Sequence, residues 1–157
     1  MAIHSDVVEK KTAQQRAAER LERQERLNAA REAEEARRAE SYCEIAAELK
    51  EKGIFPEEYF RSDGMPKDRE ISEFISLLEY FIRTGNREGY SQFVMTRPID
   101  SSTSREYINN VANKLQKDVP VIGDAVKNTG FGTSVGKTYA TIRYVLKQLG
   151  YNCVLTV

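Results

Sequence analysis

The stretch from about Val8 to Lys52 contains no glycine and no proline, and it is rich in Ala, Glu, Arg, Gln and Lys. These residues are strong helix formers, so the stretch predicts one long helix, on the order of 60 Å at ~1.5 Å per residue. Pairs of glutamate and arginine four residues apart, such as Glu34 with Arg38, each add roughly 0.2–0.5 kcal/mol. We therefore expect a charged helical arm over residues 8–52, preceded by a disordered N-terminus over residues 1–7.

Large apolar side chains are scarce in this arm before Tyr42, where Leu21 and Leu27 are the main ones. A two-stranded coiled coil normally repeats larger residues at both seam positions. The arm is therefore predicted to be either a charge-stabilised single helix or a weak coiled coil with an alanine-lined seam. The arm is either a solvated spacer or a segment that self-associates or binds a protein partner. From Tyr42 onward an apolar stripe begins, which predicts that the last turns pack onto the globular part.

The composition of the 157-residue chain suits one domain plus an appendage. The 24 Lys and Arg residues balance the 24 Asp and Glu residues, which argues against a general polyanion binder. Two cysteines far apart and a single histidine, His4, give no disulfide framework, metal site or histidine-based triad. No apolar run is long enough to span a membrane, and no signal-peptide core is present, so a cytoplasmic protein with no membrane partner is expected.

Residues 53–157 are predicted to form a mainly α-helical globular domain that folds without the arm. Gly53 ends the arm, and Ser62-Asp63-Gly64 is a turn signal. The first predicted helix covers about residues 67–83, with Asp68 near its N-cap and the widest apolar face in the chain. A short helix follows, with Tyr90, Phe93 and Val94 inward. The third runs from an N-cap at Thr103 to about Lys117, with an inward face of Ile108, Val111, Ala112 and Leu115. Tyr151, Cys153, Leu155 and Val157 fall on one side of an extended chain and the residues between them on the other, which predicts a short C-terminal β-strand. Such a strand needs a partner, which is residues 93–96, residues 119–122 or a second subunit.

The final 39 residues, 119–157, carry the most distinctive pattern in the chain. A short apolar segment precedes the glycine-rich turn Thr129-Gly130-Phe131-Gly132, and an amphipathic helix follows, which ends at Gly150. This order of short helix, turn, long helix and strand resembles the second half of a winged helix-turn-helix domain. The resemblance implies DNA binding through the long helix.

The long helix, whose start Thr133 or Ser134 can cap, has one apolar stripe, at Val135, Tyr139, Ile142, Leu146 and Leu149. The other face combines the small residues Gly136 and Ala140 with basic residues, a combination that permits close approach to a duplex and contact with phosphate or guanine. The predicted nucleic-acid-binding residues are Lys127, Lys137, Arg143, Tyr144 and Lys147. The alternative interpretation is an ordinary packed C-terminal helix with a solvated basic face.

The end of a phosphate-binding P-loop is matched by Gly136-Lys137-Thr138. The first glycine of that motif is missing, because Gly130 lies one residue too early and Gly132 one residue too late. A free anion site at the helix N-terminus is more plausible than nucleotide hydrolysis. No other catalytic constellation is present. We therefore expect a non-enzyme without cofactor or metal.

The sequence leaves two functions open. The first is a dimeric DNA-binding protein that uses residues 119–157. The second is a structural, assembly or inhibitory factor that binds a protein partner or self-associates through residues 8–52. DNA binding would depend on the C-terminal cations, whereas partner binding would depend on the arm, so a comparison of the full chain with residues 53–157 separates the two.

Overall fold

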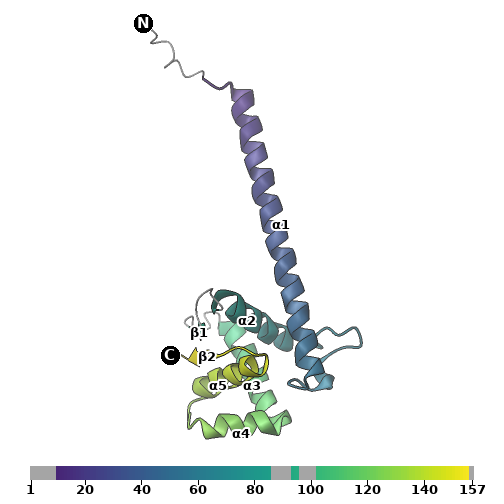
Figure 1. The fold of residues 1–157 in the computed structure, drawn as a ribbon, viewed down its shortest axis with the longest axis vertical. Helices are drawn as coiled ribbons and strands as arrows, with labels where there is room; N and C mark the ends of the chain where they lie inside the picture. The colour runs from purple at the N-terminus through teal and green to yellow at the C-terminus, as the bar shows by residue number, and fades with distance from the viewer. Residues whose placement is uncertain (1–9, 86–92, 96–101, 156–157) are drawn as a thin grey trace. The chain divides into compact units, whose positions relative to one another are not determined.

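The computed structural model describes residues 10–85, 93–95 and 102–155, and the predicted disordered N-terminus lies outside the described residues. The chain is mainly α-helical, so the predicted fold class is confirmed at that level. Figure 1 labels α1 (Ala13–Glu51), α2 (Arg69–Gly85), β1 (Phe93–Met95), α3 (Ser102–Asp118), α4 (Pro120–Asn128), α5 (Ser134–Gln148) and β2 (Cys153–Leu155). A short 3-10 helix, η2 (Glu57–Tyr59), lies between α1 and α2 in the chain.

Helix α1 begins with a reciprocal cap. The Thr12 hydroxyl accepts a hydrogen bond from the Gln15 amide at 3.1 Å, and the Gln15 side chain accepts one from the Thr12 amide at 2.8 Å. This capping box satisfies two of the free amides at the helix start, and the charged sequence then continues the helix. The helix ends before Gly53, which has a φ of 66°. The predicted stop is therefore confirmed, because glycine adopts this conformation at low cost.

The chain divides into two compact units, Met1–Ala39 and Glu40–Val157. Every residue from Lys10 to Ala39 is exposed or half-buried, whereas Ile45, Ala46 and Leu49 belong to the buried core of the second unit. The apolar stripe that starts at Tyr42 therefore packs as expected. The domain boundary predicted at residues 52 and 53 stays a prediction, and the compact unit starts at Glu40.

The core of the second unit is built around α2. Ile71, Phe74, Ile75, Leu78 and Phe81 are all at most 3% exposed, and Asp68 caps the helix by accepting a hydrogen bond from the Ile71 amide at 3.0 Å. The predicted inward face of α3 is also buried: Ile108, Val111, Ala112 and Leu115 are at most 2% exposed. Phe55 adds an aromatic cluster against α2, with its ring centroid 5.8 Å from that of Phe74. Both predicted core faces are confirmed, because their apolar residues recur at helical spacing.

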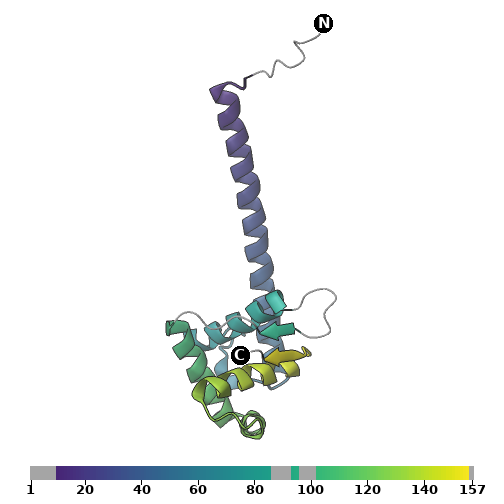
Figure 2. The same ribbon diagram turned by 90° about the vertical axis from the view of Figure 1, so that its left-hand side faces the viewer.

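A short parallel pair of strands joins distant parts of the chain. Strand β1 pairs with β2 in the register Phe93–Cys153, Val94–Val154 and Met95–Leu155. Figure 2 shows the two arrows side by side. The predicted helix around Phe93 and Val94 was therefore wrong at these residues, since pairing with β2 overrides local helical spacing. Tyr90, the third residue of that prediction, lies outside the described residues.

Helix α3 starts at Ser102, one residue before the predicted cap at Thr103, and ends at Asp118. Pro120 then opens α4 at its first turn, where a missing amide costs nothing. The two helices meet closely, because a Cβ added at Gly123 would lie 2.5 Å from the backbone oxygen of Gln116. Glycine is therefore required at position 123 for α4 to pack against the end of α3 in this way.

A buried phenol links the loop after α1 to the end of α3. The Tyr59 hydroxyl donates a hydrogen bond to Asp118 Oδ2 at 2.9 Å, and the Tyr59 side chain is 2% exposed. Burial and the neighbouring Asp118 carboxylate raise the pKa of Tyr59 above its ordinary value.

This raised pKa predicts a loss of stability in alkali. The unfolded chain releases the Tyr59 proton at pH ~10, whereas the folded chain holds it to higher pH. The free energy of unfolding should therefore be constant below pH ~10 for this group and fall as the pH rises above it. Tyr59→Phe should cost roughly 1.5–3 kcal/mol at neutral pH, because a hydrogen bond to a charged acceptor is removed. It should also flatten the alkaline part of the profile. Denaturant titrations at several pH values measure both, and an unchanged alkaline slope in the variant would contradict the assignment.

Candidate nucleic-acid interface

The turn between α4 and α5 places the start of α5. Gly130 has a φ of 75°, and Thr133 then caps α5 by accepting a hydrogen bond from the Gly136 amide at 3.0 Å. Thr133, one of the two predicted caps, is therefore confirmed. At the other end Gly150 has a φ of 99°, and the Tyr151 amide donates to the Leu146 carbonyl at 3.0 Å. This is the hydrogen bond of a Schellman motif, so the predicted helix stop at Gly150 is also confirmed.

Two buried hydroxyls fix how α5 lies against α3. Thr138 and Thr141 are at most 1% exposed. The Thr138 hydroxyl lies 2.8 Å from Asn109 Oδ1, and Gln116 Nε2 donates to the Thr141 hydroxyl at 3.0 Å. We call these four residues the polar seam. Buried hydroxyls must find partners, so the seam favours one rotation of α5 about its own axis.

That rotation differs from the predicted one. Ile142, Leu146 and Leu149 are buried as predicted, but Val135 is 49% exposed and Ala140 is only 5% exposed. The predicted apolar stripe was therefore wrong at Val135, and Ala140 is not a small residue on an open face. The reason is that the buried side of α5 also contains Thr138, Thr141 and Val145, residues that hydrophobic spacing alone does not select.

The predicted binding residues fall into two groups in the structure. Lys137, Arg143 and Lys147 are exposed on α5, and Lys127 is exposed on the last turn of α4. Tyr144 is half-buried and packs against the core, so its ring is only partly available for stacking. The three α5 cations span roughly 15 Å along the helix and about 120° around it, at ~1.5 Å and ~100° per residue.

The cations of α4 and α5 have few acids near them in the sequence. Within the described part of the chain, Lys127, Lys137, Arg143 and Lys147 form no ion pair. Asp124 is the one acid of residues 119–157, so the region has an excess of positive charge. An unpaired, solvated cation can exchange its counterions for a phosphate without first breaking a salt bridge. We call Lys127, Lys137, Arg143 and Lys147 the α4–α5 cations.

A second set of cations, which was not predicted, lies on α1. Arg16, Arg20, Arg23 and Arg31 are all exposed, and at ~100° per residue they lie within about 80° of one another around the helix. We call them the arginine stripe. The signal was available in the sequence as intervals of four, three and eight residues. The nearly equal numbers of acids and bases in the arm hid it, because total charge does not distinguish one face of a helix from another.

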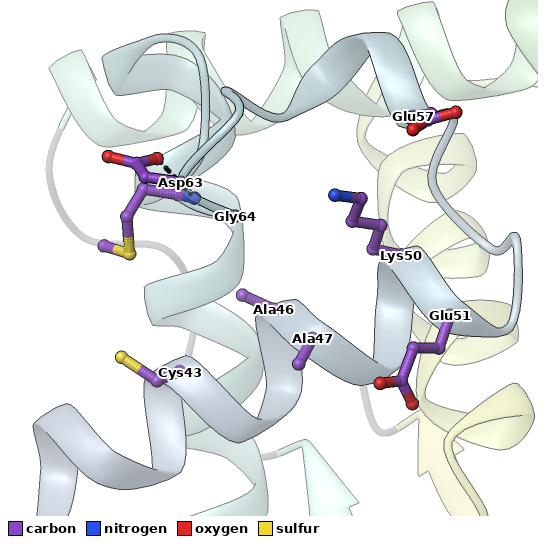
Figure 3. A pocket seen from close by; sticks show the side chains of 9 residues that line it. Cys43, Ala46, Ala47, Lys50, Glu51, Glu57, Asp63 and Gly64 are labelled. Atoms are coloured by element: carbon purple, nitrogen blue, oxygen red, sulfur yellow. Dashed lines mark hydrogen bonds between the residues drawn. The ribbon is translucent and has the colours of Figure 1, made fainter.

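An open groove of about 610 Å³ lies within the second unit, between the last turns of α1 and the loop that precedes α2. In Figure 3, Cys43, Ala46 and Ala47 lie on α1, and Asp63 and Gly64 lie on the loop across the groove. The groove is lined by Cys43, Ala46, Ala47, Lys50, Glu51, Glu57, Asp63, Gly64 and Met65. Asp63 already accepts a hydrogen bond from the Met65 amide at 2.9 Å and pairs with Arg61, so its carboxylate serves the loop itself.

Three further findings concern the chemistry of the chain. Among the described residues, no group of three or more His, Cys, Asp or Glu side chains could hold a metal ion. No helix in the described ranges is long and apolar enough to cross a membrane. Comparison with protein-family models, curated proteins and solved structures gives no match.

Proposed function

We propose that this chain is a non-enzymatic DNA-binding protein and that the α4–α5 cations contact the phosphate backbone. The observation that carries the proposal is that Lys137, Arg143 and Lys147 project from one helix, are exposed, and pair with no described acid. Cations arranged in this way supply sequence-independent affinity for a duplex.

The order of elements adds support to this proposal. Helix α4, the turn at residues 129–133, helix α5 and strand β2 follow one another as in the second half of a winged helix-turn-helix domain. In this interpretation α5 is the recognition helix, and its N-terminal end is capped by Thr133. The buried Ala140 limits close approach at the middle of α5, so we assign backbone contact to this face, with no base readout.

The test is binding to a duplex DNA of about 30 base pairs at several salt concentrations. Replacing Lys137, Arg143 and Lys147 together with Ala should weaken binding, because fewer phosphates are then neutralised. The slope of log affinity against log salt should fall by roughly 0.9 for each phosphate that the variant no longer neutralises. The melting temperature should change little, because exposed cations each contribute under about 1 kcal/mol.

A matched control removes the same charge outside α4 and α5. Arg61, Lys67 and Lys117 are exposed cations of the same unit, and their joint replacement with Ala should leave the salt slope unchanged. No detectable binding of the unmodified protein at low salt would refute the proposal. Equal reductions of the slope in the two triple variants would also refute it, because binding would then follow net charge alone.

A second candidate function is a protein-interaction factor that acts through the arm. The specific observation is that Leu21 and Leu27 are each 60% exposed on a helix whose residues from Lys10 to Ala39 contain none that is buried. An oligomer or partner complex formed through them should dissociate when both leucines are changed to Ser. Sedimentation of the unmodified chain and of the Leu21→Ser, Leu27→Ser variant over a range of concentrations measures this dissociation. A monomer mass that does not change with concentration in the unmodified chain would exclude self-association.

A further inference from the structure

The arginine stripe is a one-sided charged surface on a helix. Arg16, Arg20, Arg23 and Arg31 share one side of α1, whereas Glu22, Glu25 and Glu32 lie on the opposite side at ~100° per residue. Between residues 16 and 32 the arm therefore has a basic face and an acidic face, although its total charge is nearly balanced. Such separation is not needed for helix stability, because glutamate and arginine four residues apart stabilise a helix on any face.

The acids closest to the stripe are engaged with cations outside it. Glu19 pairs with Lys11 at 2.6 Å, and Glu34 pairs with Arg37 at 2.7 Å and with Arg38 at 3.4 Å. The hydrogen bond from Arg37 lowers the pKa of Glu34, which keeps that carboxyl ionised and paired. The four stripe arginines form no ion pair with a described residue. Arg31 makes one long hydrogen bond, at 3.5 Å, to Asn28.

The spacing of the stripe suits a regular line of anions. Arg16 and Arg31 are roughly 22 Å apart along the helix at ~1.5 Å per residue. One strand of a DNA duplex presents a phosphate about every 3.4 Å along its axis, so about six phosphates lie within that length. Arginine is suited to such contacts, since its guanidinium forms bidentate hydrogen bonds with phosphate oxygens.

We infer that the arginine stripe is a second DNA-binding surface, which lies along the phosphates of one strand and adds affinity without sequence preference. This inference rests on the proposed function, because it assumes that the protein binds duplex DNA. The acidic face determines the depth of contact: a helix inserted into the major groove would bring Glu22, Glu25 and Glu32 near phosphates on the far wall. Repulsion there favours a shallow contact along one strand.

The experiment uses the full chain and the same duplex of about 30 base pairs, together with a second duplex of unrelated sequence. Replacing the four stripe arginines with Gln should lower the salt slope by up to about 3.6, or ~0.9 per neutralised phosphate. The reduction should be the same on both duplexes. Glutamine is a good helix former, so the helix content measured by circular dichroism should not change.

The matched control compares two double variants that remove equal charge. Arg20→Gln with Arg23→Gln should reduce the slope by about 1.8, whereas Arg26→Gln with Arg37→Gln should leave it nearly unchanged. Arg26 and Arg37 lie roughly a quarter-turn away from the centre of the stripe at ~100° per residue. Equal effects of the two double variants would overturn the inference.

The outcomes distinguish this inference from the function on which it rests. If the unmodified protein does not bind DNA, both fail. If the α5 triple variant loses binding while the stripe variants match the unmodified protein, the stripe inference alone is overturned. If the α5 triple variant keeps part of the salt slope, and further replacement of the stripe arginines removes that part, the result supports both surfaces. A slope reduction that differs between the two duplexes would overturn the claim of sequence-independent contact.

Discussion

A fragment of residues 53–157 should lose its cooperative unfolding transition, contrary to the expectation from the sequence that these residues fold without the arm, whereas a fragment of residues 40–157 should keep it. The last turns of α1 place Ile45, Ala46 and Leu49 in the core, at 8%, 2% and 0% exposure. Removal of a buried Leu or Ile side chain alone costs roughly 2–5 kcal/mol. The loss of this helical segment therefore approaches the whole stability of an ordinary domain, about 5–15 kcal/mol. Calorimetry of the two fragments measures the transitions.

The control for this truncation is a single change in the intact chain. Leu49→Ala should lower the free energy of unfolding by ~2–5 kcal/mol and leave unfolding cooperative. A sharp transition in residues 53–157 at the melting temperature of the full chain would show that these turns are dispensable. It would also favour the domain boundary at residues 52 and 53.

Leu146→Ala should separate the stability of α5 from its binding. Leu146 is 0% exposed, so its truncation should cost roughly 2–5 kcal/mol, because burial is reduced and a cavity forms. The salt slope of DNA binding should remain that of the unmodified protein once affinity is corrected for the folded fraction, because every cation is retained. Val135→Ala is the comparison, since Val135 is 49% exposed and its truncation should cost little. A changed slope in Leu146→Ala at full folding would contradict this assignment.

Local signals predicted much of the fold. Asp68, Thr133 and Gly150 act at the helix ends as expected, since a cap or a left-handed residue is chosen by a few neighbouring atoms. The buried faces of α2 and α3 were predictable for a related reason: their apolar residues repeat at the helical period. The mainly helical class follows from these features.

The remaining features depend on partners far away in the sequence. Residues 93–96 were one of three possible partners predicted for the C-terminal strand, and only their pairing with residues 153–155 distinguishes a strand from a helix there. The rotation of α5 depends on Asn109 and Gln116 of α3, so hydrophobic spacing misplaced Val135 and Ala140. The four candidate binding cations are exposed and Tyr144 is half-buried, and their role in binding stays a prediction. The arginine stripe becomes evident only when the residues of α1 are placed around the helix axis, because the basic face is then distinguished from the acidic one.

The polar seam also bears on which misfolded arrangements the chain avoids. Thr138 and Thr141 each bond to their own helix as well, to the carbonyls of Ser134 and Lys137 at 3.0 Å and 2.8 Å. Sliding α5 by one turn along α3 would keep apolar contacts but separate both cross-helix pairs. Both hydroxyls would keep their bonds within α5, but the two cross-helix hydrogen bonds would be lost at roughly 0.5–1.5 kcal/mol each, so the slipped packing lies about 1–3 kcal/mol above the native one. This energy gap selects a single register, and the cations of α5 are consequently displayed in one fixed pattern.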